Sequence, residues 1–190
     1  MTSAVPEHEH PIVVVDYDSA WPQWFTRSAA AIREACGALV IAIEHIGSTS
    51  VPGLAAKPIV DIMPMLARFD DGFACVAPLE ALGYTSRGEF GIRGRHYFVR
   101  DAGARLDRGE QDDRLPEHVH VYARGADEAV RHLLLRNYLR AHPERAAAYA
   151  ALKRDLALRF RDDREGYSEA KTDFILETVA LARRAAAAGE

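Results

Sequence analysis

A carboxylate inside an apolar run is the feature that most constrains the fold of this chain. Residues 59–66 read IVDIMPML, so apolar side chains fill both faces of a two-residue repeat and Asp61 is the one charged member. This pattern predicts a β-strand that is covered on both faces. An ionised carboxylate in such a strand is costly unless a cation, a metal ion or hydrogen-bond donors compensate it. We therefore expect Asp61 to be at least partly buried and to have such a partner.

The composition limits the class of protein. A chain of 190 residues that is 48% apolar can bury a core, and its formal net charge of −4 argues against a dedicated nucleic-acid-binding protein. No apolar run approaches the roughly 18 residues that cross a bilayer, and the N-terminus lacks the features of a signal peptide. We expect a soluble cytoplasmic protein with no membrane partner, in which Cys36 and Cys75 are buried free thiols.

Hydrophobic periodicity and turn residues predict an α+β fold with a mixed β-sheet core. Strands are expected at residues 39–46, 59–66, 95–100 and 118–122, and helices at about 20–36, 73–82, 127–141, 144–160 and 168–187. The polar segment 101–117 is long enough to form a flap between two strands. We expect residues 1–124 to form the core and residues 125–190 a helical region, packed together as one structural unit.

The loop between the first two strong strands has the composition of a phosphate-binding loop. Gly47, Ser48 and Thr49 follow the first strand directly. Backbone N–H groups and hydroxyls can donate to phosphate oxygens there, and glycine permits a close approach that a side chain would block. Lys57 precedes the strand of Asp61 and can reach either a phosphate or that carboxylate. A solvated surface lysine is the alternative for Lys57.

Two histidines on a later strand suggest a second kind of chemistry. His118 and His120 lie two residues apart, so both point to one face of their strand. Together with Asp61 they supply two imidazoles and a carboxylate, a set that suits Zn²⁺, Mn²⁺ or Fe²⁺ better than Mg²⁺. The alternative is that both histidines line a solvated cleft or hydrogen-bond to Asp61.

Four further cations are candidates for binding an anionic substrate. Arg95 lies in a strand beside aromatic residues, where it can bind a phosphate or form a cross-strand ion pair. Arg136 and Arg140 recur at helical spacing, and Lys171 lies at the last predicted helix. If these three face the cleft they can hold a phosphate, whereas a solvated helix face is the other interpretation.

The segment HIGSTSVPGLAAKPIVDI, residues 45–62, resembles the signature of the GrpB-like family, whose fold belongs to the nucleotidyltransferase superfamily. This bacterial family has a poorly defined biochemical role and also occurs fused to dephospho-coenzyme A kinase. The likeness covers nearly the whole chain. Its other positions are Tyr17, Trp21, residues 118–121 and 136–144, Tyr149, Leu152, Lys153, Tyr167 and Lys171.

The resemblance implies a nucleotidyltransferase-like α+β core but an incomplete metal site. Enzymes of the superfamily usually carry Asp-x-Asp on the second strand and a third acid on a neighbouring strand, which together hold two Mg²⁺ ions. Here Asp61 matches the first acid, Met63 replaces the second, and the third position falls at His120. A thioether does not replace a carboxylate as a ligand for Mg²⁺. One Mg²⁺ bridged by substrate phosphates, Mn²⁺ or Zn²⁺ at the histidines, and binding without a metal all stay open.

From these features we expect the chain to bind a nucleotide or a phosphorylated small molecule. Metal-dependent nucleotidyl transfer would give Asp61 and Ser48 catalytic roles, although whether the chain is an enzyme stays open. One alternative is a non-catalytic accessory or folding-assistance protein that partners an enzyme of the coenzyme A pathway, as the family fusion implies. Another is a transition-metal site at Asp61, His118 and His120.

Overall fold

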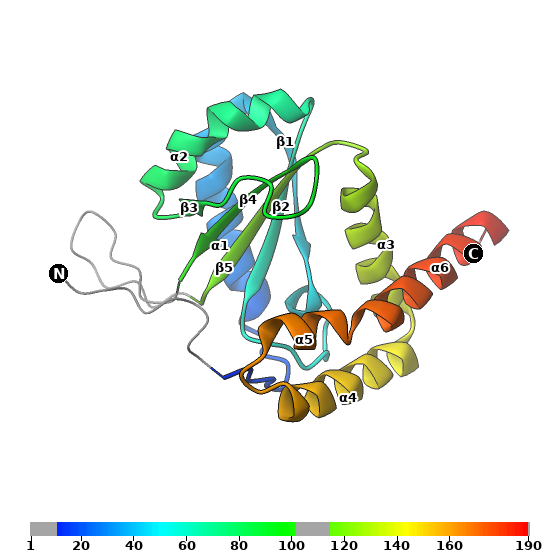
Figure 1. Ribbon diagram of the computed structural model, residues 1–190. Coiled ribbons are helices and arrows are strands. Elements are labelled where there is room, and N and C mark those ends of the chain that lie inside the picture. Colours follow the sequence, from blue (N-terminus) through cyan, green and yellow to red (C-terminus); the bar gives the residue numbers. More distant parts are fainter. Residues whose placement is uncertain (1–10, 102–114, 190) are drawn as a thin grey trace.

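A mixed β-sheet forms the centre of the computed structural model, which describes residues 11–101 and 115–189 (Figure 1). Within these residues the sheet has five strands in the order β1-β2-β5-β4-β3. β2 and β5 run parallel, and the other neighbours are antiparallel. The α+β class and the mixed sheet predicted from the sequence are therefore confirmed. The strands are β1 (Val40–Ile46), β2 (Val60–Leu66), β3 (Thr85–Ser86), β4 (Arg95–Arg100) and β5 (Glu117–Ala123).

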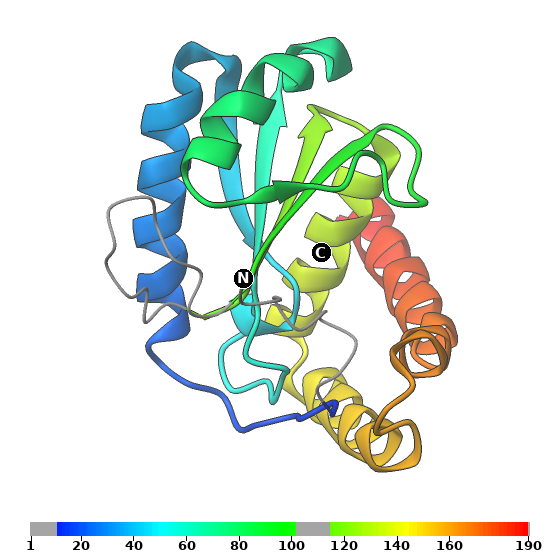
Figure 2. The ribbon, with the colours of Figure 1, turned by 60° about the vertical axis from the view of Figure 1, so that its left-hand side comes forward.

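Helices cover both faces of this sheet (Figure 2). α1 and α2 lie on one face, and α3 lies on the other, with α4, α5 and α6 on the side of α3. An apolar cluster joins the loop after β1 to α3, α4 and α6. The helices are α1 (Trp21–Cys36), α2 (Val76–Ala81), α3 (Asp127–Ala141), α4 (Pro143–Arg159), α5 (Arg164–Glu169) and α6 (Thr172–Ala188).

The two faces of β2 have different environments. Val60, Ile62 and Leu66 pack into the core cluster beneath α1 and α2. Met63 is fully buried in a second cluster, which includes Ala129 of α3. Because side chains alternate along a strand, Asp61 lies on the same face as Met63, toward α3. The sheet therefore presents its one carboxylate of β2 to the side that carries the C-terminal helices.

The structure differs from the predicted elements at three places. The helix expected at 73–82 begins as a 3₁₀ segment, Phe69–Cys75, because Pro78 of α2 has no N–H with which to continue an α-helical ladder backwards. The last predicted helix is two helices, α5 and α6, and Asp163 caps α5 by accepting from the Gly166 amide at 2.9 Å. The short strand β3 was not predicted. Most of the predicted flap, residues 102–114, lies outside the described residues.

The structure bears on two expectations, one about membrane-spanning helices and one about the cysteines. Among the described residues, no helix is both long and apolar enough to cross a membrane. Cys36 and Cys75 are free and buried, as expected. Both belong to the cluster between the sheet and the helices α1 and α2.

A buried ionic network fixes the beginning of β5. Glu117 is fully buried, accepts a hydrogen bond from the Ser28 hydroxyl at 2.5 Å and another from the Tyr84 hydroxyl, and pairs with Arg100 at 2.7 Å. The Arg100 guanidinium also donates to the Leu82 carbonyl at 3.1 Å. The network thus ties β5 to α1, to β4 and to the end of α2. Since His118 follows Glu117 directly, the network also fixes the position of this histidine.

Substitution of Arg100 by Met should lower the free energy of unfolding by about 3–5 kcal/mol, because it leaves the Glu117 carboxylate buried without its cation. Urea denaturation of the purified variant measures this loss. Arg159→Met is the matched control, since Arg159 pairs with Asp155 at 3.2 Å with both side chains more than half exposed. An exposed pair of this kind contributes at most about 1 kcal/mol. Equal losses of unfolding free energy for the two variants would contradict a stabilising role for the buried Arg100–Glu117 pair.

Candidate functional site

Strand pairing brings the predicted site residues together. Asp61 of β2 lies opposite Ile46, the last residue of β1, and opposite His118 of β5. His120 is two residues further along β5 on the same face. The structure therefore places the Gly-Ser loop, the carboxylate and both histidines in one neighbourhood, as the sequence predicts.

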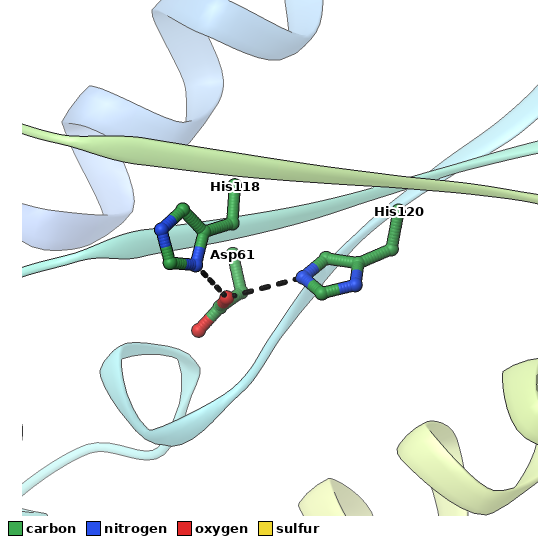
Figure 3. A group of neighbouring side chains, drawn as sticks. All are labelled: Asp61, His118 and His120. Atoms are coloured by element: carbon green, nitrogen blue, oxygen red, sulfur yellow. Dashed lines mark hydrogen bonds and ion pairs between the residues drawn. The ribbon is translucent and has the colours of Figure 1, made fainter. Parts of the chain in front are cut away.

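Asp61 lies between the two imidazoles (Figure 3). Its Oδ1 atom is 3.3 Å from His120 Nε2 and 3.6 Å from His118 Nδ1. One potential ligand atom from each of the three residues lies within 4.8 Å of the others. The side chain of Asp61 is 25% exposed, so the group is partly buried but reachable.

The surroundings of Asp61 keep it ionised. Burial alone would raise the pKa of Asp61, but hydrogen bonds from His118 and His120, together with their charges, hold it well below its ordinary range. Burial lowers the pKa of His120, although Asp61 opposes this shift. The stability that Asp61 contributes is therefore complete above its unfolded pKa of about 4 and is lost as pH falls further. At neutral pH the site pairs a carboxylate with a neutral imidazole, the protonation states that a metal ion requires.

Arg95 contacts the far side of the His120 ring. It is 5% exposed, and its guanidinium donates to the Phe90 carbonyl at 2.9 Å and lies 3.4 Å from His120 Nδ1. Because a guanidinium only donates, this contact makes Nδ1 the acceptor and places the ring proton on Nε2, which faces Asp61. A metal ion at Nε2 would require the proton to leave that nitrogen and Arg95 to release Nδ1. Arg95, predicted to bind substrate, is not among the residues that line the cavity described below.

The Gly47 turn presses directly against Asp61. Gly47 has φ +68°, and a Cβ atom there would come within 2.1 Å of Asp61 Oδ2. Ser50 fixes the turn by donating to the Gly47 carbonyl at 2.6 Å. The Thr49 hydroxyl donates to the Ile59 carbonyl at 3.0 Å and is 3.2 Å from His45 Nε2. Thr49 is 1% exposed, so its side chain is engaged in holding the turn onto β2.

Two arginines of α3 contact the chain on either side of Gly47: Arg136 contacts the end of β1, and Arg140 contacts Ser50. Arg136 donates to Glu44 Oε2 at 2.6 Å and to the His45 carbonyl at 2.9 Å. Arg140 donates twice to the Ser50 carbonyl, at 3.0 and 2.6 Å. Arg136 lines the cavity, whereas Arg140 does not. Both guanidinium groups therefore have protein partners, an arrangement that the helical spacing in the sequence could not reveal.

A cavity of about 420 Å³ opens over these residues. Asp61, His118 and His120 line it together with the turn at Gly47 to Thr49. The helices α3, α4 and α5 and the start of α6 supply the rest of its wall. Lys57 and Lys171, both predicted to bind substrate, also line it.

Sequence reasoning assigned no role to His132 of α3, which lines the cavity beside His120. The two ring centroids are 5.6 Å apart, and His132 Nε2 is buried with no hydrogen-bond partner in the described part of the chain. Burial and the neighbouring charges of His120 and Arg131 lower the pKa of His132 to about 3. Its position four residues before Arg136 on one helical stripe was the signal available in the sequence.

Tyr149 and Lys153 of α4 and Tyr167 of α5, which are among the positions of the family resemblance in the sequence, also line the cavity. Burial raises the pKa of the Tyr149 hydroxyl, and nearby Tyr167 and Asp61 add to the shift. Lys153 is 2% exposed, which is unusual for a lysine. A lysine within an otherwise apolar helical stripe was the signal that could have identified it.

A strand, a Gly-Ser turn and a second strand whose aspartate contacts that turn lie within the mixed sheet of an α+β protein. The chain belongs to the GrpB family, because the family described as GrpB protein matches residues 11–180. The crystal structure of the conserved protein GrpB from Enterococcus faecalis superposes with a TM-score of 0.77 at 34% identity. That superposition covers 90% of this chain and 96% of the other.

Two curated relatives are longer proteins. UPF0157 protein YqkA of Bacillus subtilis is 36% identical over 173 residues, which cover 91% of this chain and 48% of YqkA. The dephospho-CoA kinase of Mycolicibacterium paratuberculosis is 27% identical over 176 residues, which cover 85% of this chain and 43% of the kinase. The chain therefore spans about half the length of YqkA and less than half of the kinase.

Gly47→Ala should destabilise the protein more than Gly53→Ala. Both glycines have positive φ values, +68° and +76°, so each substitution carries the roughly 1–2 kcal/mol cost of an L-residue in a left-handed conformation. At Gly53 nothing lies within 4 Å of the added Cβ atom, whereas at Gly47 it collides with Asp61. Urea denaturation of both variants gives the comparison. Equal losses of unfolding free energy would show that the turn and Asp61 separate without cost.

Proposed function

We propose that the chain binds a nucleotide or another phosphorylated small molecule in this cavity, with a divalent metal ion held by Asp61, His118 and His120. The observation that carries the proposal is the convergence of these three side chains, within 4.8 Å, on the wall of a 420 Å³ cavity that the Gly-Ser turn also lines. Cavities of this size commonly bind small-molecule ligands.

The donor set favours a transition metal over Mg²⁺. One carboxylate and two imidazoles are typical ligands of Zn²⁺, Mn²⁺ or Fe²⁺, whereas Mg²⁺ prefers oxygen ligands. Met63, at the position of the second acid in the superfamily, is fully buried and packs with Ile46 and Tyr122. A two-Mg²⁺ arrangement therefore lacks a ligand. When bound, a divalent ion would supply positive charge to phosphate oxygens.

Different groups of the protein would bind the metal ion, bind phosphate and position the turn. Asp61 keeps its charge at neutral pH and would hold the ion, while His120 gives up its hydrogen bond to do so. Backbone N–H groups of the Gly47 turn and the Ser48 hydroxyl would bind phosphate oxygens. Arg136 and Arg140 would keep that turn in place through the carbonyls of His45, before it, and Ser50. Nucleotidyl transfer, if the chain performs it, would use Asp61 and Ser48.

A second candidate function is a non-catalytic accessory role in coenzyme A metabolism. The alignment with a dephospho-CoA kinase over 85% of this chain supports it. In this interpretation the same cavity binds dephospho-coenzyme A or coenzyme A, and the chain assists the enzyme that uses it.

Metal binding is tested by calorimetric titration of the wild type with Zn²⁺, Mn²⁺ and Mg²⁺. We expect Zn²⁺ and Mn²⁺ to bind more tightly than Mg²⁺. Asp61→Asn and His120→Ala should each weaken binding by at least about 10–100-fold, the loss that even outer-sphere changes produce at metal sites. A ligand at about 100 times its dissociation constant adds about 2.7 kcal/mol, or roughly 5–10 °C in Tm for a chain of this size.

His142→Ala is the control for this titration, because His142 stacks on Tyr138 and does not line the cavity. It should bind the metal as the wild type does. A wild type that binds none of the three ions, or a His120→Ala variant with unchanged affinity, would overturn the metal assignment and leave the histidines as hydrogen-bond partners of Asp61.

The two candidate functions separate in a ligand comparison. Thermal-shift measurements with Mn²⁺ present should give a larger rise in Tm with nucleoside triphosphates than with dephospho-coenzyme A or coenzyme A if the first proposal holds. The reverse order, together with co-elution of this chain and a dephospho-CoA kinase in gel filtration, would favour the accessory role. Asp61→Asn should abolish the nucleotide shift in the first case.

A further inference from the structure

All three lysines of the chain line the cavity described above. The sequence contains 24 Lys and Arg residues, of which only Lys57, Lys153 and Lys171 are lysines, and each of them contributes to the cavity wall. Arg136, Arg140 and Arg95 instead donate to backbone carbonyls. A guanidinium stays protonated under all ordinary conditions, while a buried ammonium can lose its proton. The lysines are therefore the cavity cations that can change their charge, beside Arg131 and Arg136, which keep theirs.

Lys171 and Lys153 are held on aromatic rings. Lys171 Nζ lies 4.0 Å from the centroid of the Tyr167 ring, and Lys57 Nζ lies 5.6 Å from the same centroid. Lys153 Nζ lies 4.6 Å from the Tyr149 ring and donates to the Ala55 carbonyl. The two tyrosines thus position ammonium groups from three separate elements around one space.

Neither Lys153 nor Lys171 has a carboxylate within ion-pair distance in the described ranges 11–101 and 115–189. The hydroxyl oxygen of Tyr167, a residue that is 1% exposed, is buried and has no hydrogen-bond partner among those residues. Buried polar groups without partners are costly and are rare in proteins that have no ligand to satisfy them. Two ammonium groups and one phenol are also the donors that a tetrahedral dianion accepts from.

We propose that Lys153, Lys171 and Tyr167 form an anion subsite that binds the terminal phosphate group of the ligand, with Lys57 adding positive charge at its edge. The subsite shares the cavity with the proposed function but does not depend on the metal ion. Its ligand is a phosphate monoester or the terminal phosphate of a short polyphosphate. Free inorganic phosphate has the same chemistry and is distinguished by experiment.

Binding at this subsite should take up protons. Burial, with the nearby charges of Lys171 and Arg154, lowers the pKa of Lys153 to about 7. Burial and the charge of Lys57 lower the pKa of Lys171 to about 7, against the attraction of Asp61. The same cavity is also lined by Tyr149 and Tyr167, by the histidines His118, His120 and His132, and by Arg131 and Arg136. A bound dianion favours the protonated lysines and raises both pKa values, so at pH 8 each lysine should gain close to one proton.

Calorimetric titration at pH 8 with EDTA present, in Tris and in HEPES, measures this uptake from the difference in observed heat. Sulfate is the first probe because it does not titrate near this pH, and inorganic phosphate is the second. We expect the wild type to take up about two protons per bound sulfate. Lys171→Met should bind at least 10-fold more weakly and lose about one proton of the uptake. Tyr167→Phe should bind about 10-fold more weakly, as loss of one hydrogen bond to a charged group predicts.

Arg159→Met, which removes an exposed cation of α4 outside the cavity, is the matched control and should bind sulfate as the wild type does. Asp61→Asn should still bind sulfate, so failure of the metal proposal leaves this result unchanged. Competition with adenosine monophosphate then identifies the source of the phosphate: displacement at lower concentration than inorganic phosphate assigns the subsite to a nucleotide, and the reverse assigns it to the free ion. Sulfate and phosphate binding with equal affinity in the wild type, Lys171→Met and Tyr167→Phe would overturn the proposal.

Discussion

The ionised carboxylate of Asp61, placed on a strand that is buried on both faces, is the constraint on which the rest of the site depends. Two imidazoles of β5 compensate it at 3.3 and 3.6 Å. The turn after β1 closes over its other oxygen so tightly that only a glycine fits at position 47. The arginines of α3 then donate to the carbonyls of His45 and Ser50, which flank Gly47. With an apolar residue at position 61, the two imidazoles would lose their carboxylate partner.

The chain uses its cations in two physically different ways. Arg95, Arg136 and Arg140 serve as permanent donors to backbone carbonyls, a role that the fixed geometry and charge of a guanidinium suit. The lysines line the cavity, where burial lowers the pKa of Lys153 and Lys171 to about 7. The titratable lysines therefore share the cavity wall with Arg131 and Arg136, whereas Arg95 and Arg140 do not line it.

The mixed sheet of this GrpB-family protein carries a single carboxylate on β2, Asp61. Met63, two residues further along the same face of β2, contributes to the core beneath α3 and offers no oxygen ligand. The histidines of β5 change the remaining donor set from oxygen ligands to a mixture of oxygen and nitrogen. A set of one carboxylate and two imidazoles suits a transition-metal ion better than Mg²⁺, which prefers oxygen ligands.

The sequence by itself determined the local elements and the face on which each candidate residue lies. Periods of 2 and 3.6 residues gave four of the five strands within about a residue and the whole of α3, and they placed His118 and His120 on one face. Tertiary structure decided what those faces meet. The parallel pairing of β2 with β5, which no local pattern specifies, brings His118 beside Asp61. Packing of α3 against the turn likewise directed Arg136 and Arg140 to carbonyls, and the arrangement of α4, α5 and α6 buried Lys153 and Tyr167 at the cavity. Long side chains reach several partners from one position, so their contacts depend on the neighbours that the fold supplies.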